Sequence, residues 1–540
     1  MSTAQEYVEA IFRRARIPLE PADYHPDWAD QPLRHKAYSD ASRLPLPPGP
    51  SEPQAQDARL GLESLAGMLR HSYGLISRRL QVNGNQDNAD RTWLRTATWG
   101  RGTASGGGLY PAEIYWAAGP SGPVQPGLYH YSTPHHAMDR LLAGDVTGQV
   151  RAALGDGAGA AETDQFLLVS LKFWKNSFKY NSFCYHVVTM DLGALLATWQ
   201  AWAGVAGVTL RSALWFDEPA LDRLLGVDYR DESVFAVVPL PWIPGPARPG
   251  PVARQAADGS SPRVTKREFE RSRTTLRFEM VEKVHESTIV AEAAHPELRL
   301  AEAHPAPSRP ETILLPPPRA PGMTLGDALR HRHSSFGCFS AQPPLSLEKL
   351  GRLLAAGQAG QILNTDAREA GRGPSLGRLA VFANHVEGLP RGAYDYDAVA
   401  HALSPIAGEP PSPFLQWQYF LNNYNLEQAA AVITVVVRPA AVVSAIGDRG
   451  YRLVNAEVGA VAEAVYLAAA AAGASCGAAL GFDNVSLAER LGLDGTDEWP
   501  ALLLLVGNDR ADRAGFEDLL VPAAGLGAGH SGPGTSGEPR

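Results

Sequence analysis

The lysine and tyrosine at positions 179 and 180 form the pair in this chain with the clearest potential for proton transfer. The free side chains have pKa values near about 10.4 and 10, so neither is a base at neutral pH in water. Burial can lower the pKa of a lysine by several units, and the pair could then accept a proton. The competing interpretation is a surface Lys179 beside a packing Tyr180.

A glycine-rich turn, Ser105-Gly106-Gly107-Gly108, stands before Leu109-Tyr110-Pro111 and an expected strand at 112–118. Three glycines let backbone N–H groups approach a ligand closely, and the serine hydroxyl beside them can donate a hydrogen bond. By itself the same pattern also suits a tight loop before a strand.

Arg332 and Ser334, one residue apart in Arg332-His333-Ser334-Ser335-Phe336, follow the start of an amphipathic helix. A guanidinium and a hydroxyl can both donate hydrogen bonds to one phosphate, so this spacing suits an anionic group. A surface loop is the alternative for these residues taken alone.

The elements that must position these residues occur twice in the chain. Residues 127–142 and 392–406 share Gly, Tyr-x-Tyr and His-Ala, which predicts a strand, a turn and a second strand. Residues 187–208 and 453–474 share a helical stripe of apolar residues at steps of three and four. Tyr129 and Tyr394 lie 265 residues apart; Gly193 and Gly459, and Leu225 and Leu491, lie 266 apart. Because separate motifs keep nearly one offset, we interpret the chain as a tandem duplication.

This repeat defines the predicted domains. A Pro-rich N-terminal extension is followed by a first copy containing the Lys-Tyr pair, a linker, a second copy and a disordered tail. The linker is expected to contain one charged, solvated helix at 264–286. The predicted ranges are 1–55, 56–245, 246–319, 320–522 and 523–540.

Composition excludes several classes of protein. The net charge of −9 argues against a general nucleic-acid binder, which would present a basic face. The three cysteines, Cys184, Cys338 and Cys476, are too far apart in the sequence to suggest a disulfide framework or a structural zinc site, and we expect no metal. The N-terminus has no apolar signal region, and no uncharged apolar run reaches the roughly 20 residues of a membrane span. We therefore predict a cytoplasmic protein without a membrane partner.

The order of these motifs resembles the nitroreductase superfamily, specifically its SagB/ThcOx-type (McbC-like) dehydrogenases, which oxidise azolines to azoles in modified peptides. The resemblance covers about 60–245 and 320–512. It implies an α+β fold of two tandem FMN-dependent nitroreductase-like domains that form an intramolecular pseudo-dimer. A further homo-oligomer is left open.

In that family FMN lies at a dimer interface, and here the two copies would supply both sides of it. The resemblance assigns Arg332 and Ser334 to the phosphate, and a turn from Gly477 to Gly481 to the isoalloxazine edge. It adds Arg510 after Val-Gly-Asn, and from the first copy Ser105, Gly106 and Gly107. Phe336 departs from the pattern, because the family often has a second basic residue there.

The resemblance also implies the chemistry: FMN takes a hydride from the azoline ring, Lys179 is the base or tunes it, and Tyr180 orients it. The second copy has Ala445-Ile446 where the Lys-Tyr pair would repeat, which favours one catalytic site. A second pocket, from Arg70 and Ser72 with Ser375 and Gly377, looks poorer because Arg378 intrudes on its turn.

The implied partners are an azoline-containing precursor peptide and a YcaO-type cyclodehydratase complex, in a thiopeptide-like pathway. Two alternatives stay open. One is a general NAD(P)H-dependent nitro or quinone reductase on the same fold. The other is a non-catalytic scaffold of a peptide-modifying complex.

Overall fold

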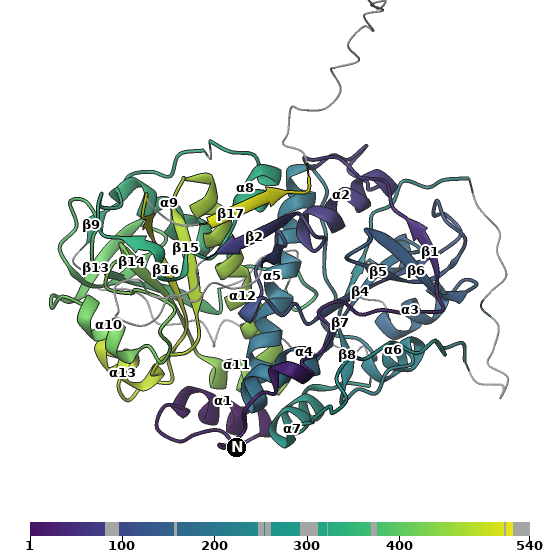
Figure 1. The fold of residues 1–540 in the computed structure, drawn as a ribbon, viewed down its shortest axis with the longest axis horizontal. Coiled ribbons are helices and arrows are strands. Elements are labelled where there is room, and N and C mark those ends of the chain that lie inside the picture. Colours follow the sequence, from purple (N-terminus) through teal and green to yellow (C-terminus); the bar gives the residue numbers. More distant parts are fainter. Residues whose placement is uncertain are drawn as a thin grey trace, which may run out of the picture.

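Two α+β copies lie on either side of a pair of long central helices in the computed structural model of the chain (Figure 1). The structure describes residues 1–81, 97–155, 159–246, 253, 261–291, 312–320, 322–368, 375–511 and 515–521. The predicted disordered tail at 523–540 lies outside these residues.

The first copy contains a six-stranded sheet with the order β1-β6-β5-β4-β7-β8. Its strands are β1 (Ser42–Pro45), β4 (Ala112–Ala118), β5 (Gly127–Ser132), β6 (Ala137–Ala143), β7 (Gln165–Lys172) and β8 (Glu232–Pro239). Its helices are α2 (Leu62–Ser72), α3 (Thr147–Leu154), α4 (Trp174–Tyr180), α5 (Cys184–Val205) and α6 (Glu218–Leu225). The strands β4, β7 and β8 are buried along their whole length, and each is mostly apolar with a few polar residues such as Glu113 and Glu232.

The second copy repeats this sheet as β9-β13-β12-β11-β14-β16, with β10 and β15 added against β16. Its strands are β9 (Ile313–Leu314), β10 (Phe339–Ser340), β11 (Gly377–Ala383), β12 (Gly392–Asp397), β13 (Ala402–Ala407), β14 (Ala431–Val437), β15 (Ser475–Ala479) and β16 (Trp499–Asp509). Its helices are α8 (Leu325–His331), α9 (Leu347–Gly360), α10 (Ser412–Gln418), α11 (Pro439–Ile446), α12 (Gly450–Ala471) and α13 (Asn484–Arg490). The predicted duplication is confirmed by this common strand order.

The repeat extends to single hydrogen bonds. Tyr131 Oη lies 2.9 Å from His136 Nδ1 in the first copy, and Tyr396 Oη lies 2.9 Å from His401 Nδ1 in the second. Each histidine donates from Nε2 to a proline carbonyl, that of Pro47 or Pro316. These prolines follow β1 and β9, short strands that lie in the predicted N-terminal extension and linker but complete the sheets of the two copies.

Helices α5 and α12 cross at the centre of the molecule, where two glycines let their backbones touch. A Cβ on Gly193 would lie 1.8 Å from the carbonyl oxygen of Ala456, and one on Gly459 would lie 1.9 Å from that of Met190. These glycines are the pair related by the 266-residue offset, so the crossing has the symmetry of the duplication. We call this crossing and its surroundings the seam. The two copies therefore form the predicted pseudo-dimer within one chain.

Other segments cross the seam as well. The strand β17 (Gly515–Leu519), from the second copy, pairs with β2 (Ser77–Gln81), which also pairs with β3 (Thr98–Gly100). The N-terminal helix α1 (Thr3–Arg13) lies at one end of the seam (Figure 1), where Tyr7 donates a hydrogen bond to the carbonyl of Ser182. The two copies are thus interlocked at several points.

The linker differs from its prediction. No helix spans 264–286; residues 261–278 lack regular structure, and α7 (Glu279–Thr288) follows them. Val281, Val284 and His285 are buried, so α7 is a packed element and not a solvated connector. Residues 268–274 stay irregular because they bind the surface of the first copy, where Glu270 pairs with Lys172.

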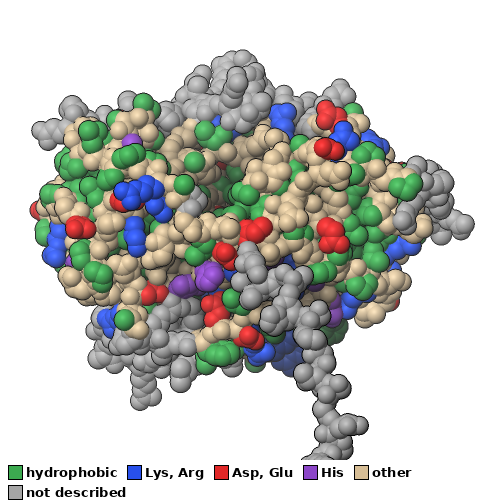
Figure 2. All heavy atoms as spheres, turned by 90° about the horizontal axis from the view of Figure 1, so that it is seen from above, with side chains coloured by type: hydrophobic (Ala, Val, Ile, Leu, Met, Phe, Trp, Pro, Cys, Tyr) green, Lys and Arg blue, Asp and Glu red, His purple; other side chains and the backbone are tan. Residues whose placement is uncertain are grey.

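Helix α12 has the length and apolar composition of a membrane span, as the core helices of soluble proteins also do. In the structure 78% of its most apolar window is buried. On the face shown in Figure 2, acidic and basic side chains are interspersed over the described surface, without one dominant sign. The burial of α12 is typical of a core helix, and the described surface on this face has mixed charge.

Candidate active site at the seam

The glycine-rich turn of the first copy is held by a carboxylate on the central helix α5. Ser105 Oγ donates to Asp191 Oδ2 at 2.6 Å, and the Gly106 N–H donates to Asp191 Oδ1 at 2.7 Å. Ser105 Oγ also accepts a hydrogen bond from the Tyr110 N–H at 2.9 Å. These contacts fix the turn against the seam.

Asp191 is a functional candidate that the sequence reasoning missed. Its side chain is buried, and burial raises its pKa to about 7, although the hydrogen bonds from Ser105 and Gly106 act in the opposite direction. The signal was present in the repeat: Asp191-Leu192-Gly193 matches Glu457-Val458-Gly459, an acidic residue two positions before the equivalent glycine of the long helix in both copies.

Lys179 and Tyr180 lie beside this turn, at the end of α4. A Cβ placed on Gly107 would lie 2.6 Å from Tyr180 Oη and 2.9 Å from Lys179 Nζ. Lys179 Nζ lies 5.0 Å from the centre of the Tyr180 ring. The structure therefore brings the predicted proton-transfer pair against the predicted glycine turn, both within the first copy.

The burial that the sequence argument required of Lys179 is absent. The Lys179 side chain is exposed and that of Tyr180 is half-buried, although the preceding residues of α4, Trp174 to Phe178, are all buried. Burial of the Tyr180 hydroxyl raises its pKa, and the nearby Asp191 raises it further. At neutral pH Tyr180 is thus a neutral hydrogen-bond donor.

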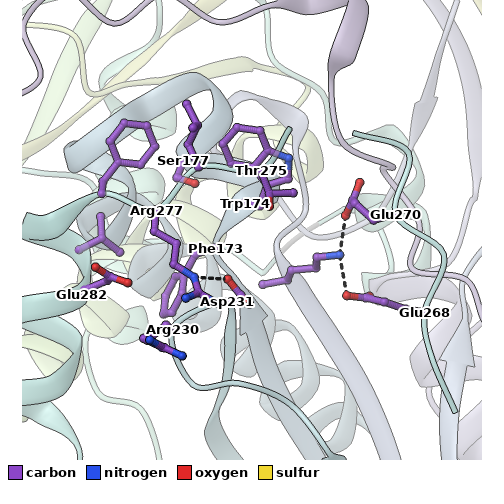
Figure 3. Close-up of a pocket in the computed structure, with 14 residues that line it drawn as sticks. Phe173, Trp174, Ser177, Arg230, Asp231, Glu268, Glu270, Thr275, Arg277 and Glu282 are labelled. Carbon is purple, nitrogen blue, oxygen red and sulfur yellow. Dashed lines mark hydrogen bonds and ion pairs between the residues drawn. The ribbon is translucent and has the colours of Figure 1, made fainter. Parts of the chain in front are cut away.

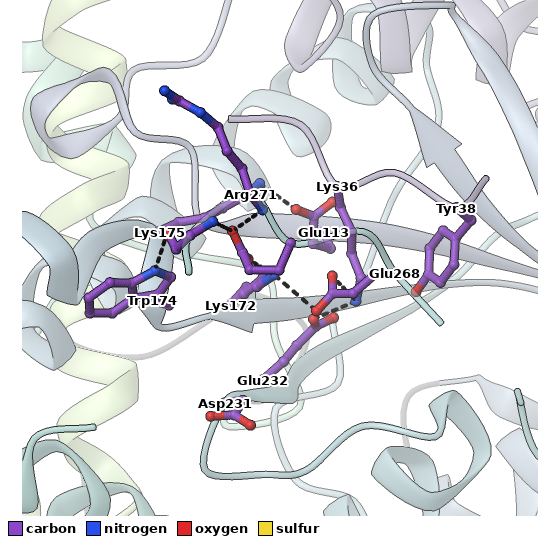
Figure 4. Close-up of polar contacts among 12 residues, drawn as sticks. Lys36, Tyr38, Glu113, Lys172, Trp174, Lys175, Asp231, Glu232, Glu268 and Arg271 are labelled. Carbon is purple, nitrogen blue, oxygen red and sulfur yellow. Dashed lines mark hydrogen bonds and ion pairs between the residues drawn. The ribbon is translucent and has the colours of Figure 1, made fainter. Parts of the chain in front are cut away.

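A buried charge pair anchors the other end of α4. Lys175, one helical turn before Lys179, pairs with Glu113 on β4, and both side chains are almost fully buried. Figure 4 shows this pair within a wider group of polar contacts that includes Lys36 and Glu232, 2.5 Å apart. Because separating a buried ion pair is costly, the start of α4 is held firmly against β4, and this fixes the helix that carries the Lys-Tyr pair at its end.

Arg332 and Ser334 reach the seam from the second copy. Arg332 is buried; its Nε donates to the Gly102 carbonyl at 2.5 Å and its Nη2 to the Arg101 carbonyl at 2.8 Å. Ser334 Oγ shares a hydrogen bond of 2.8 Å with Tyr466 Oη. Arg332 thus touches the chain that leads directly into Ser105, as the prediction of a shared site requires.

A second buried carboxylate joins the two sides here. Glu463, on α12, accepts a hydrogen bond from the Ala104 N–H at 2.8 Å. Burial raises the pKa of Glu463 to about 7, against the opposing charge of Arg332. The Thr198 hydroxyl lies close enough to lower this pKa, but by distance and angle Oε1 is buried without a hydrogen-bond partner among the described residues. A protonated Glu463 could donate from this oxygen to a ligand.

The remaining predicted flavin-binding residues of the second copy, Gly477, Gly481 and Arg510, are held by contacts within that copy. Gly477 lies inside the strand β15 and not in a turn, so that prediction was wrong; the small residues Ser475–Ala479 pair with the apolar strand β16. A Cβ on Gly477 would meet the Tyr424 ring at 2.4 Å, and Phe336 stacks on that same ring. The Gly481 carbonyl accepts a hydrogen bond from the Phe420 N–H. Arg510 is half-buried, and its backbone N–H donates to the Cys338 carbonyl.

A separate cavity of about 140 Å³ lies between the end of β7, α4, the turn before β8 and the linker with α7 (Figure 3). Aromatic and charged side chains line it, among them Trp174, Asp231, Glu270 and Arg277. None of the predicted site residues lines this cavity. The candidate site is therefore the seam.

The two neighbouring glycines Gly107 and Gly108 allow a matched test of this geometry. Both have φ near +65°, so alanine at either position carries the same left-handed strain, roughly 1–2 kcal/mol. Only at Gly107 would the methyl group displace Lys179 Nζ and Tyr180 Oη, because Gly108 has no atom within 4 Å of its Cβ position. We expect both variants to lose similar stability, measured by denaturant unfolding, but Gly107→Ala to lose far more activity. Equal activities would contradict this placement of the pair.

Comparison with known proteins agrees with the architecture. Residues 329–508 match the model of the Nitroreductase family. The chain is similar in structure to a putative nitroreductase from Anabaena variabilis ATCC 29413, with a TM-score of 0.71, 22% identity, and coverage of 94% of this chain and 100% of the other. At that level of identity the likeness establishes the fold and no more. No curated protein matches the chain.

Two further likenesses are limited in extent. A putative nitroreductase from Ralstonia eutropha JMP134 has a TM-score of 0.30 and 23% identity, covering 40% of this chain and 99% of the other. The E. coli microcin synthetase McbBCD complex with truncated pro-MccB17 has a TM-score of 0.27 and 16% identity, covering 39% of this chain and 70% of the other. Neither supports a statement about the whole protein. The second copy contains a nitroreductase family domain, and the chain as a whole has the nitroreductase-like fold in two tandem copies.

Proposed function

We propose that this protein is an FMN-dependent dehydrogenase that oxidises peptide thiazolines or oxazolines to thiazoles or oxazoles. The coarser class, an oxidoreductase, follows from the nitroreductase family domain at 329–508. The finer assignment is supported by one observation above all: the Lys179-Tyr180 pair packs against the glycine turn at the seam between the copies.

The residues at the seam fit a flavin nucleotide. The turn at Ser105–Gly108 leaves open space at Gly108, and glycine is required at Gly107, as in a cradle for a planar group. Two nitrogens of Arg332 bind backbone carbonyls, which leaves Nη1 for an anion such as a phosphate, and Ser334 adds a hydroxyl. The unpaired Oε1 of Glu463 adds a polar atom with no partner among the described residues.

The protein's own part in the reaction is to position the substrate and to take a proton. Bound FMN would supply the hydride acceptor for the hydrogen that leaves the azoline ring. The ring also loses its Cα proton, and we assign Lys179 Nζ as the atom that takes it. Tyr180 Oη, protonated at neutral pH, orients the substrate or the lysine by donating a hydrogen bond. Because Lys179 is exposed, the bound ligands must supply the desolvation that makes it basic.

A general NAD(P)H-dependent nitro or quinone reductase is the second candidate. It is favoured by the exposure of Lys179 and would not need the Lys-Tyr pair. A non-catalytic scaffold is the third, motivated by Phe336, whose ring stacks on Tyr424 where a second basic residue was expected.

One experiment separates the three. The purified protein is mixed anaerobically with a synthetic peptide containing one thiazoline, or with NADPH, and its flavin absorbance is followed. The proposal predicts bleaching by the peptide, which loses two hydrogen atoms by mass spectrometry. Rapid bleaching by NADPH, without reaction of the peptide, would favour the reductase. A protein that shows no flavin bands and does not take up FMN would favour the scaffold.

A further inference from the structure

The duplication creates two pseudo-symmetric positions at the seam, and they are not equivalent. One lies between the Ser105 turn and Arg332. The other would lie between the described residues Ser375–Gly377 and the residues Arg70 and Ser72. We infer that the chain binds a single FMN, at the first position, and that the second is closed by the buried ion pair of Arg368 and Glu457. This inference rests on the proposed function and specifies how many FMN molecules each chain binds.

The carboxylates that hold the two turns have different partners. Asp191 receives hydrogen bonds from Ser105 and Gly106 of the turn itself. Its repeat mate Glu457 instead accepts from Arg368 Nε at 2.9 Å and from Arg368 Nη2, besides the Leu376 N–H at 3.3 Å. The side chains of Arg368 and Glu457 are 1% and 3% exposed. The guanidinium therefore lies where a ligand would have to approach the carboxylate and its turn.

Removing Arg368 from that place would leave Glu457 as an uncompensated buried charge. Such a separation is strongly unfavourable, because the desolvation of the carboxylate is no longer offset by its partner. Even with Arg368 present, burial raises the pKa of Glu457 to about 7. A ligand that approached Glu457 would thus have to break this buried ion pair, whose carboxylate also accepts the Leu376 N–H.

The phosphate side of the second position is also closed. Ser72 is fully buried in α2; its hydroxyl donates to the Met68 carbonyl at 2.6 Å and accepts from Trp199 Nε1 at 2.9 Å. Arg70 is half-buried and makes only long contacts of 3.4 Å to the carbonyls of Pro48 and Leu520, so the closure on this side is due to Ser72. In the second copy Val465 occupies the place of Trp199 in the repeat, and Ser334 is only half-buried. A large indole therefore covers the hydroxyl in one copy and not in the other.

The proton-transfer pair is missing from the second position as well. Helix α11 ends in Ala445 and Ile446 where α4 ends in Lys179 and Tyr180. Ile446 is buried and packs in the core. A flavin site has three parts, namely the turn, the anion ligands and the reactive pair. In all three, the first position is better suited to FMN than the second.

The test is a titration of FMN into the flavin-free full chain, followed by flavin fluorescence and by equilibrium dialysis. We expect one FMN per chain. Arg332→Ala should weaken its binding by at least about tenfold, whereas Arg70→Ala, its counterpart at the second position, should leave affinity and stoichiometry unchanged. If Arg332→Ala fails to fold, as judged by circular dichroism, Ser334→Ala takes its place.

Two outcomes would overturn the inference, and they are distinguishable. Two FMN per chain, with one lost in Arg70→Ala, would show that the second position is open and leave the proposed function intact. No FMN binding by the folded wild-type chain would overturn the proposed function and, with it, the inference.

Discussion

Replacement of Lys179 by alanine is expected to lower the rate of azoline oxidation by about 10²–10⁴-fold, the usual contribution of a general base, while the protein keeps its FMN. Lys179 Nζ would lie 2.9 Å from a Cβ on Gly107, whereas Ser105 and Gly106 hold the turn through their hydrogen bonds to Asp191, so the substitution leaves those hydrogen bonds in place. Tyr180→Phe removes only the hydroxyl and is expected to act in the same direction. The measurement is the single-turnover rate of azole formation by mass spectrometry, beside the flavin absorbance.

Lys179→Arg separates two roles for this lysine. Arginine keeps the positive charge but is not deprotonated in proteins. The variant therefore loses the ability of Lys179 to act as a base and keeps its positive charge. We expect Lys179→Arg to be as slow as Lys179→Ala. The matched control is Lys283→Ala. Lys283 is an exposed lysine on α7 that pairs with Glu279 of the same helix, so its replacement should change neither the rate of azole formation nor the flavin content. Full activity in both Lys179→Ala and Tyr180→Phe would remove the pair from the mechanism.

Replacement of Gly193 by alanine is expected to destabilise the protein by at least about 3 kcal/mol, at the upper end of the cost of overpacking a core. A methyl group at this position would lie 1.8 Å from the Ala456 carbonyl oxygen, which belongs to the backbone of a buried helix and cannot rotate away. The helices α5 and α12 would have to move apart, which would disrupt the packing of the two copies at the seam. Gly459→Ala is expected to have a similar effect, because its methyl group would meet the Met190 carbonyl oxygen at 1.9 Å.

The control for this prediction lies in the same helix. Gly204, near the end of α5, has no atom within 4 Å of its Cβ position and is exposed. Gly204→Ala is therefore expected to stabilise the protein by up to about 1 kcal/mol through helix propensity alone. Both variants are compared with the wild type by denaturant unfolding. Similar free energies of unfolding for Gly193→Ala and Gly204→Ala would show that the close crossing of α5 and α12 is not needed for stability.

The duplication, the two long helices and the hairpins at 127–142 and 392–406 could be predicted because their signals are local. Apolar periodicity and turn residues recur within a few positions, so a repeat offset of 265–266 residues is visible without a structure. The candidate residues Ser105, Gly107 and Lys179 could be selected in the same way, since each stands in a short motif.

The environment of those residues depended on contacts between distant segments. The carboxylate of Asp191 became a candidate only when Ser105, 86 positions away, was placed against it. Gly477 lies in a β-strand because that segment pairs with β16, and α7 is a packed helix because it lies against the seam. Neither contact is visible in the local sequence. Residue types and spacing therefore determined which groups could do chemistry and that they occur in two copies. Tertiary structure decided which copy presents them openly, because burial and the pairing of charges are properties of the space around a side chain and are not encoded in its immediate neighbours.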